Sequence, residues 1–529
     1  MPWRPLIIFV AAVLCFSLAF ALGGWYGGPL LLLGAAVMLY FLATTFLDWH
    51  AIHRPLGQAQ ELIRSRDFSG ALTILERVAR ARPWTTPAAL HGVYYPLGAI
   101  YALQGQHERA VEQFLKLLEL GGKYRVLVPP ATVAEAKAQI AACYDALGQA
   151  EAASEMRRQA LASFGNNLTD PMHLFVRGRL LKAEWRYREA ADCFAGALEL
   201  SRYREPAIRL EMSLEAALAS YECGRTEDIL RFAREGLALE PPSTLTRDCA
   251  ALAGIAARLL RRPEEAVAYH RQAYELAMAR QDLPQAIDSL VMIATVDCFE
   301  GRIEAALAQL RDAGTLSDDS EAQRSVEAGR LDCYVESGRL DEARASLQRL
   351  YSLPYLYVLA LPELLRGVHG CILARLEIIA GNLDQARAVL DPAQVILRRH
   401  EKLGLSCRHL SAWLAALAGE RDRALAEIAA LEALLPALED NWETGPSCCS
   451  DLGKACCHLG EYDRAIALLQ RWPEEREHPI NLPERWYYLG ECYRAQGNLP
   501  AAREWYTKAA QTGFETGYTR LAAERLNEK

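Results

Sequence analysis

Four cysteines and a histidine lie within eleven residues near the carboxyl end: Cys448, Cys449, Cys456, Cys457 and His458. Thiolates and imidazoles are ligands that zinc prefers, and adjacent thiols can also carry redox chemistry. The spacing is poor for a metal, because on a helix Cys449 and Cys456 share a face, whereas Cys457 and His458 point elsewhere. The chain also contains no Cys-x-x-Cys motif. Buried cysteine packs like a small apolar residue, so we predict packing here rather than a metal or cofactor site.

Sequence motifs of the common enzyme classes are missing from the chain. It has no phosphate-binding glycine-rich loop, no Gly-x-Ser-x-Gly and no His-Glu-x-x-His. The formal net charge of −8 argues against a nucleic-acid-binding protein, which normally carries a basic face. The other cysteines are scattered without a disulfide pattern, which favours unpaired thiols in a reducing compartment. We therefore predict a binding protein rather than an enzyme.

The first fifty residues contain two apolar runs, residues 6–22 and residues 30–47, which carry no charge until Asp48. At about 1.5 Å per residue, each run is just long enough to span a bilayer core as a helix. The intervening residues 23–29 are rich in glycine and end in Pro29, which favours a turn. Residues 1–50 are thus predicted to be a transmembrane helical hairpin that provides membrane contact through residues 6–47.

The basic residues predict the orientation of this hairpin. Arg4 precedes the first run and Arg54 follows the second, so the positive-inside rule places both ends in the cytoplasm. A cleaved signal peptide, with Ala19-Phe20-Ala21 as the processing site, is an alternative for the first run. A hydrophobic hairpin buried in a soluble fold is another. We expect an integral membrane protein, in a bacterial inner membrane, with the remainder of the chain cytoplasmic.

A small residue recurs along the rest of the chain at intervals of 37 to 43 residues. Eleven of these twelve positions, called rungs below, are alanine: Ala71, Ala110, Ala153, Ala190, Ile229, Ala266, Ala306, Ala343, Ala386, Ala424, Ala465 and Ala502. A glycine stands five residues before nine of them. Small side chains let helices approach closely, and glycine allows the left-handed backbone that ends a helix. This pattern predicts about twelve pairs of antiparallel helices.

One unit shows the pattern most fully. From Pro483 onward, Trp486, Leu489, Gly490, Tyr493, Gly497, Leu499, Ala502, Tyr506 and Ala509 occupy relative positions 4, 7, 8, 11, 15, 17, 20, 24 and 27. This unit resembles the tetratricopeptide repeat family almost position by position. The resemblance implies an all-α, right-handed solenoid over residues 51–516, preceded by the membrane hairpin and closed by a capping helix over residues 517–529. The average period of about 39 residues is longer than the 34 usual for the family.

The resemblance also implies a concave groove lined by the first helix of each pair, mainly through positions 2, 5, 9, 12 and 13. The residues of this chain at such positions are Tyr95, Phe175, Arg179, Lys182, Lys454, His458, Tyr487, Glu491 and Arg494. Chaperone-binding members use Lys at position 5 and Asn at position 9. No unit has either, the nearest being His409, so binding of a chaperone tail is not expected.

These features together predict a membrane-anchored scaffold or adaptor that binds protein or peptide partners in its groove. Two alternatives stay open. One is a sensor in which the repeats respond to a peptide or small ligand. The other is a thiol or zinc protein acting through the cluster at residues 448–458.

Overall fold

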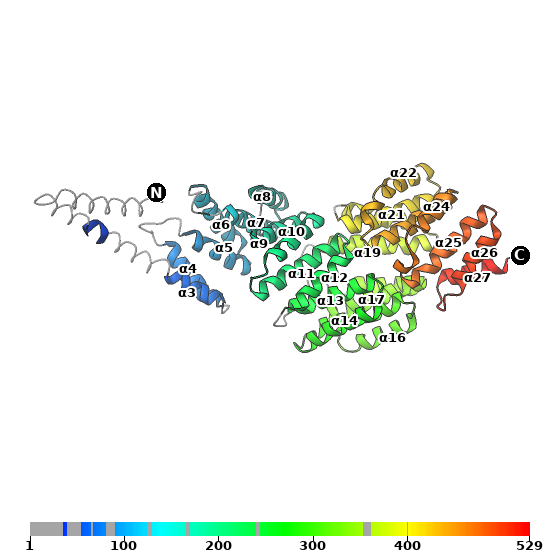
Figure 1. The fold of residues 1–529 in the computed structure, drawn as a ribbon, viewed down its shortest axis with the longest axis horizontal. Coiled ribbons are helices and arrows are strands. Elements are labelled where there is room, and N and C mark those ends of the chain that lie inside the picture. Colours follow the sequence, from blue (N-terminus) through cyan, green and yellow to red (C-terminus); the bar gives the residue numbers. More distant parts are fainter. Residues whose placement is uncertain are drawn as a thin grey trace, which may run out of the picture. The chain divides into compact units, whose positions relative to one another are not determined.

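A computed structural model describes residues 35–39, 54–64, 67–80, 90–123, 128, 130–164, 170–239, 244–352, 361–398 and 400–528. Within them the structure contains helices and no strand (Figure 1). No helix of these residues is long and apolar enough to cross a membrane. The predicted transmembrane hairpin lies outside the described residues except for residues 35–39, so it stays a prediction.

The chain divides into two compact units, residues 1–184 and residues 185–529. The described helices of the first unit from residue 54 onward are α3 (Arg54–Arg64), α4 (Phe68–Arg80), α5 (His91–Leu103), α6 (His107–Lys123), α7 (Pro130–Ala146), α8 (Ala150–Ser163) and α9 (Pro171–Ala183).

The second unit begins with α10 (Tyr187–Leu200), α11 (Pro206–Glu222), α12 (Thr226–Leu237), α13 (Thr244–Leu259), α14 (Pro263–Met278), α15 (Leu283–Phe299), α16 (Ile303–Gly314), α17 (Ser320–Ser337) and α18 (Leu340–Ser352). It continues with α19 (Leu361–Ile379), α20 (Leu383–Leu397), α21 (Glu401–Leu417), α22 (Arg421–Glu432), α23 (Thr444–His458), α24 (Tyr462–Leu469), α25 (Leu482–Ala495), α26 (Leu499–Ala510) and α27 (Gly517–Asn527). Three short 3₁₀ helices, η3 (Leu435–Leu438), η4 (Glu474–Arg476) and η5 (Pro479–Asn481), lie in the connections.

The helices alternate along the chain as the rungs predict. We call the odd-numbered helices from α3 to α25 the A helices and the even-numbered helices from α4 to α26 the B helices. Each A helix is followed in the chain by the B helix of its pair. Every rung lies on a B helix and is at most 2% exposed. At Gly453 and Gly490, an added Cβ would lie 2.6 Å from Leu469 and 2.5 Å from Tyr506 of the paired B helix. Small residues therefore allow close approach from both sides, and the described chain is an all-helical repeat array.

The bend between the two helices of a pair uses the left-handed backbone that the glycines predict. Gly338 shows the geometry, because it caps α17 with φ 72° and donates its N–H to the carbonyl oxygens of Tyr334 and Val335. Three rungs lack this glycine. Before two of them, Ala190 and Ala266, Trp185 and Arg261 take the same conformation, with φ 64° and 59°. A left-handed residue other than glycine costs roughly 1–2 kcal/mol. At Arg261 the packing of α13 against α14 therefore holds the bend without glycine.

Candidate partner-binding cavity

A cavity of about 810 Å³ lies in the second unit, lined by the A helices α17, α19, α21, α23 and α25 and by the terminal helix α27. Four of the residues predicted for the groove line it: His458, Tyr487, Glu491 and Arg494. Three tyrosines form an aromatic cluster on its wall, Tyr487, Tyr488 and Tyr518, whose ring centroids lie 5.6 to 5.9 Å apart. Amphipathic rings of this kind offer a rigid apolar surface with a polar edge.

A group of buried charges lies beside this cavity. Lys454 is fully buried, and its Nζ lies 2.6 Å from Asp451 Oδ1 and 3.1 Å from Glu484 Oε1. The same ammonium lies 3.9 Å from the centre of the Trp413 ring, and His409 Nδ1 lies 2.6 Å from Asp451 Oδ2. Burial alone would raise the pKa of Asp451, but the charges of Lys454 and Arg375 outweigh it and hold that pKa far below its usual range.

Arg375 of α19 lines the cavity next to this group. Its guanidinium nitrogens lie 3.9 Å from Asp451 and 3.7 Å from Glu484, which is beyond hydrogen-bonding distance. Both carboxylates are already contacted at shorter range by Lys454. Arg375 is thus attracted to this side of the cavity while its N–H groups keep capacity for a further acceptor.

Glu336 of α17 lines the same cavity and makes no hydrogen bond with another described residue. Burial raises its pKa to about 7, although the charge of Arg375 acts in the opposite direction. At neutral pH this carboxyl group is therefore present in both protonation states and can either donate or accept a hydrogen bond. The cavity thus combines an arginine, a titrating carboxyl and an aromatic wall.

Several predicted site residues lie elsewhere. Lys454 is buried beneath the cavity, so its ammonium is an internal partner of Asp451 and Glu484 rather than a groove contact. In the first unit, Tyr95 of α5 is close to Arg179 of α9 and hydrogen-bonds Gln139 of α7. Burial raises the pKa of Tyr95, and Glu135 adds to that shift.

The remaining residues of the first unit contribute differently. Phe175 is only 4% exposed, and its ring centre lies 6.0 Å from the Arg179 guanidinium, so it packs inside the unit instead of presenting a free surface. Lys182, near the end of α9, is half-buried and makes contacts of its own. The first unit therefore brings Tyr95 and Arg179 near one another, separately from the cavity of the second unit.

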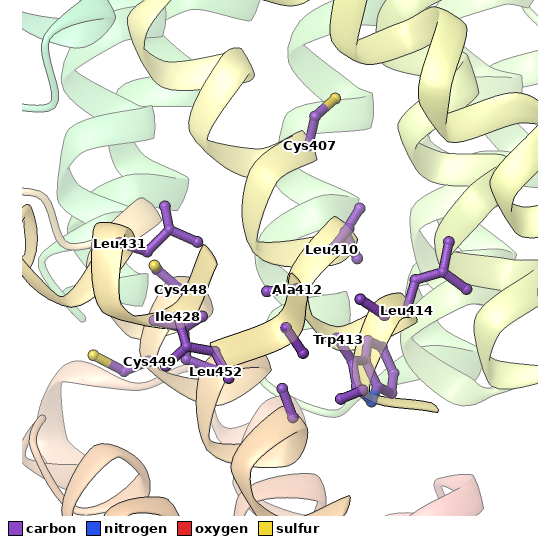
Figure 2. Close-up of a cluster of buried hydrophobic side chains, with 14 of the residues drawn as sticks. Cys407, Leu410, Ala412, Trp413, Leu414, Ile428, Leu431, Cys448, Cys449 and Leu452 are labelled. Atoms are coloured by element: carbon purple, nitrogen blue, oxygen red, sulfur yellow. The ribbon is translucent and has the colours of Figure 1, made fainter. Parts of the chain in front are cut away.

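The cysteines near the carboxyl end do not converge on one point. Cys448, Cys449 and Cys456 are buried in the apolar core, and Figure 2 shows the first two among Ile428, Leu431 and Leu452. Cys457 instead lines the cavity and hydrogen-bonds Cys492 of α25. His458 lies 5.8 Å, centroid to centroid, from the Tyr488 ring. No group of three or more His, Cys, Asp or Glu side chains suited to a metal occurs in the part of the chain that the structure describes.

One thiol pair differs from the sequence expectation. Cys371 of α19 and Cys407 of α21 form a disulfide, with 6.0 Å between their Cα atoms. The expectation of unpaired thiols is wrong for these two residues. They stand 36 positions apart in sequence and meet only because neighbouring A helices stack, which a search for close cysteine spacings cannot detect.

Family models of the tetratricopeptide repeat match four segments of the chain: residues 91–120, 249–284, 448–477 and 483–512. These segments correspond to four helix pairs, α5 with α6, α13 with α14, α23 with α24, and α25 with α26. The chain contains tetratricopeptide repeats. The cavity is thus lined in part by two of the matched repeats, the last two of the chain.

The chain is similar to several solved structures. Apo RapI is 13% identical, with a TM-score of 0.49, over 66% of this chain and 98% of that one. Cut9 with Hcn1, from the APC/C, is 13% identical with a TM-score of 0.42, over 92% and 99%. The human IFIT1 dimer with PPP-AAAA is 18% identical with a TM-score of 0.39, over 83% and 91%. The search of curated protein sequences found no match.

Proposed function

We propose that this protein is a tetratricopeptide-repeat scaffold that binds a peptide segment of a partner protein in the cavity of its second unit. In the same proposal, residues 6–47 tether the scaffold to a membrane, with the repeats on the cytoplasmic side. A tether would raise the local concentration of captured partners at the membrane surface.

The observation that supports this proposal is the combination of Arg375 and the tyrosine wall in one cavity formed by successive A helices. Helical repeats bind extended segments through side chains that successive helices offer along a concave face. Arg375 is available to a carboxylate or carbonyl oxygen, and Tyr487 to an apolar side chain. A segment that carries both groups would engage α19 and α25 together.

A second candidate, a sensor of a small ligand, is favoured by the size of the cavity. About 810 Å³ is within the range of pockets that hold small molecules. The two candidates differ in what occupies the cavity, a polypeptide or a small compound, and crosslinking distinguishes them.

The test places a photoreactive amino acid at Leu521, which lines the cavity and is 40% exposed, in the full-length protein in its native cells. The matched control places it at the fully exposed Tyr203, in the connection between α10 and α11. We expect one discrete polypeptide adduct at position 521, lost on Arg375→Ala and absent at position 203. Identical adducts at both positions, or chaperones alone, would contradict the scaffold. A small-molecule adduct at position 521 would instead support the sensor.

The tether is tested separately by fractionation of the same cells with the full chain and with a chain that lacks residues 1–50. We expect the full chain in the membrane fraction, resistant to extraction by alkaline carbonate, and the shortened chain outside it. Equal behaviour of the two chains would overturn the tether while leaving the crosslinking result intact.

A further inference from the structure

Three pairs of cysteines occupy matching places on neighbouring A helices. The pairs are Cys298 with Cys333, Cys371 with Cys407, and Cys457 with Cys492. In the first and third pairs, the two cysteines precede the rungs of their repeats by eight and ten residues. In the second pair they precede them by fifteen and seventeen, which is seven residues, or about two helical turns, further from the rung.

In all three pairs the distances of the two cysteines from their rungs differ by two residues. Each pair is therefore brought together by the same stacking of one A helix on the next. For Cys371 and Cys407 this stacking gives a Cα separation of 6.0 Å and a disulfide. In the other two pairs the side chains are already in contact, because a thiol hydrogen bond joins the partners in each. The repeat geometry therefore brings three cysteine pairs together, one of which is bridged and two of which are dithiols that need little movement to be bridged.

The three pairs differ in how accessible their sulfur atoms are from solvent. Cys298, Cys333 and Cys407 are fully buried, and Cys371 is 8% exposed. Cys457, by contrast, is half-buried and lines the cavity, with the buried Cys492 directly behind it. The hydrogen bond from Cys492 also lowers the pKa of Cys457, against the effect of burial, whereas the pKa of Cys298 is raised. A thiol with more thiolate character and an open path is the one that a small oxidant modifies.

We propose that Cys457 and Cys492 form an oxidation site that a peroxide reaches through the cavity and that closes to a disulfide between α23 and α25. The Cys457 thiolate attacks one oxygen of hydrogen peroxide, the O–O bond breaks, and hydroxide leaves and takes up a proton. The Cys492 sulfur then attacks the resulting sulfenic acid, the S–O bond breaks, and water leaves with the Cys492 proton. Two thiols lose two electrons in total, and one peroxide is reduced to two waters.

This site is independent of the proposed function, since it needs the cavity to be open but not to hold a partner. Its consequence is local: a covalent bond would tie together the two repeats that carry His458 and Tyr487 on the cavity wall. The Cys298–Cys333 pair provides an internal control with the same register and no opening to the cavity.

The experiment treats the full-length protein with hydrogen peroxide, alkylates the remaining thiols after unfolding, and maps disulfide-linked peptides by mass spectrometry. We expect the Cys457–Cys492 link to accumulate at least tenfold faster than a Cys298–Cys333 link. In Cys492→Ser, Cys457 should stop at the sulfenic acid and become labelled by dimedone, whereas Cys298→Ser should leave the Cys457–Cys492 link unchanged.

Equal rates for the two pairs would overturn the proposal, as would oxidation of Cys457 without a bond to Cys492. The main measurement uses the unmodified chain, so it does not depend on the folding of a variant. Circular dichroism of Cys492→Ser confirms that its labelling reports on a folded protein.

Discussion

The rungs of the B helices and the matching positions of the A helices contrast sharply within the second unit. The rungs Ala386, Ala424, Ala465 and Ala502 are alike in type and at most 2% exposed. Eleven residues before each of them, the A helices carry Arg375, Trp413, Lys454 and Glu491. In these four repeats the same backbone therefore has one row of constant small residues and one row in which every side chain differs.

This contrast shows how the two rows are constrained. A rung must fit between two helices, and that geometric demand is the same in every repeat. The A-helix row faces the cavity or the charges beside it. There the residue type can differ from one repeat to the next without changing how the helices stack. We expect stability to depend on the constant row. In the proposed function, binding specificity would depend on the variable row, with Lys454 as the exception because its charge is buried.

The largest effect is expected from Lys454→Met. The substitution keeps an unbranched side chain that is one atom shorter, but it leaves the buried Asp451 carboxylate and the Glu484 carboxylate without the Lys454 ammonium. Breaking a buried ion pair from one side costs about 3–5 kcal/mol. We therefore expect the free energy of unfolding to fall by that amount in urea denaturation followed by circular dichroism.

The control for this substitution is Lys116→Met. Lys116 pairs with Glu112 at 2.7 Å, but the two side chains are 44% and 62% exposed. An exposed pair of this kind contributes at most about 1 kcal/mol. Similar losses of unfolding free energy in the two variants would show that the charge of Lys454 contributes no more to stability than a surface charge. Lys454 would then no longer be an exception among the variable A-helix residues.

A smaller effect is expected from Ala465→Leu, which tests the constant row directly. Ala465 is fully buried, so the larger side chain would overpack α23 against α24 and cost about 1–3 kcal/mol. Ala467→Leu is the matched control, because Ala467 lies two residues further along the same helix and is exposed. We expect a change within about 0.5 kcal/mol there. Unchanged thermal unfolding of Ala465→Leu would show that the rung does not determine how closely these helices pack.

The sequence predicted the constant row well because its signal is periodic and local. An alanine at eleven of twelve positions spaced 37 to 43 residues apart, with a glycine before the bend in nine of them, shows where the helix pairs lie. It did not show that Trp185 and Arg261 adopt the left-handed bend, because nothing in their residue types favours φ 64° or 59°. At Arg261 the packing of α13 against α14 holds the backbone in this conformation, and that information is not local.

The variable row was predicted only in part. His458 and Tyr487 line the cavity, but Arg375 and Glu336 were overlooked, although they occupy groove positions 9 and 13 of their own repeats. Reading the same positions through every repeat would have found them. The burial of Lys454 and the disulfide of Cys371 depend on contacts between neighbouring repeats, so residue type and spacing within one repeat could not reveal them.

The smallest effect is expected from Glu336→Gln, and it depends on pH. The folded-state pKa of Glu336 is about 7, above its ordinary value of 4.5, so the folded chain keeps a proton that the unfolded chain has lost between these values. Stability in the unmodified protein should therefore decline as the pH rises from about 4.5 to 7. The Gln variant lacks this titrating group, so its stability should not show this decline. Because the side chain is half-buried, we expect the stability of the variant relative to the unmodified protein to be only about 1 kcal/mol higher at pH 8 than at pH 4.

Thermal unfolding of both proteins at pH 4, 6 and 8 measures this difference, with Glu504→Gln on the exposed face of α26 as the control. The unmodified protein and the Glu504 variant should follow parallel curves, and the Glu336 variant should diverge upward from them between pH 4 and 8. Three parallel curves would mean that Glu336 is solvated like a surface carboxyl. Glu336 would then be ionised at neutral pH and could accept a hydrogen bond from a partner but not donate one.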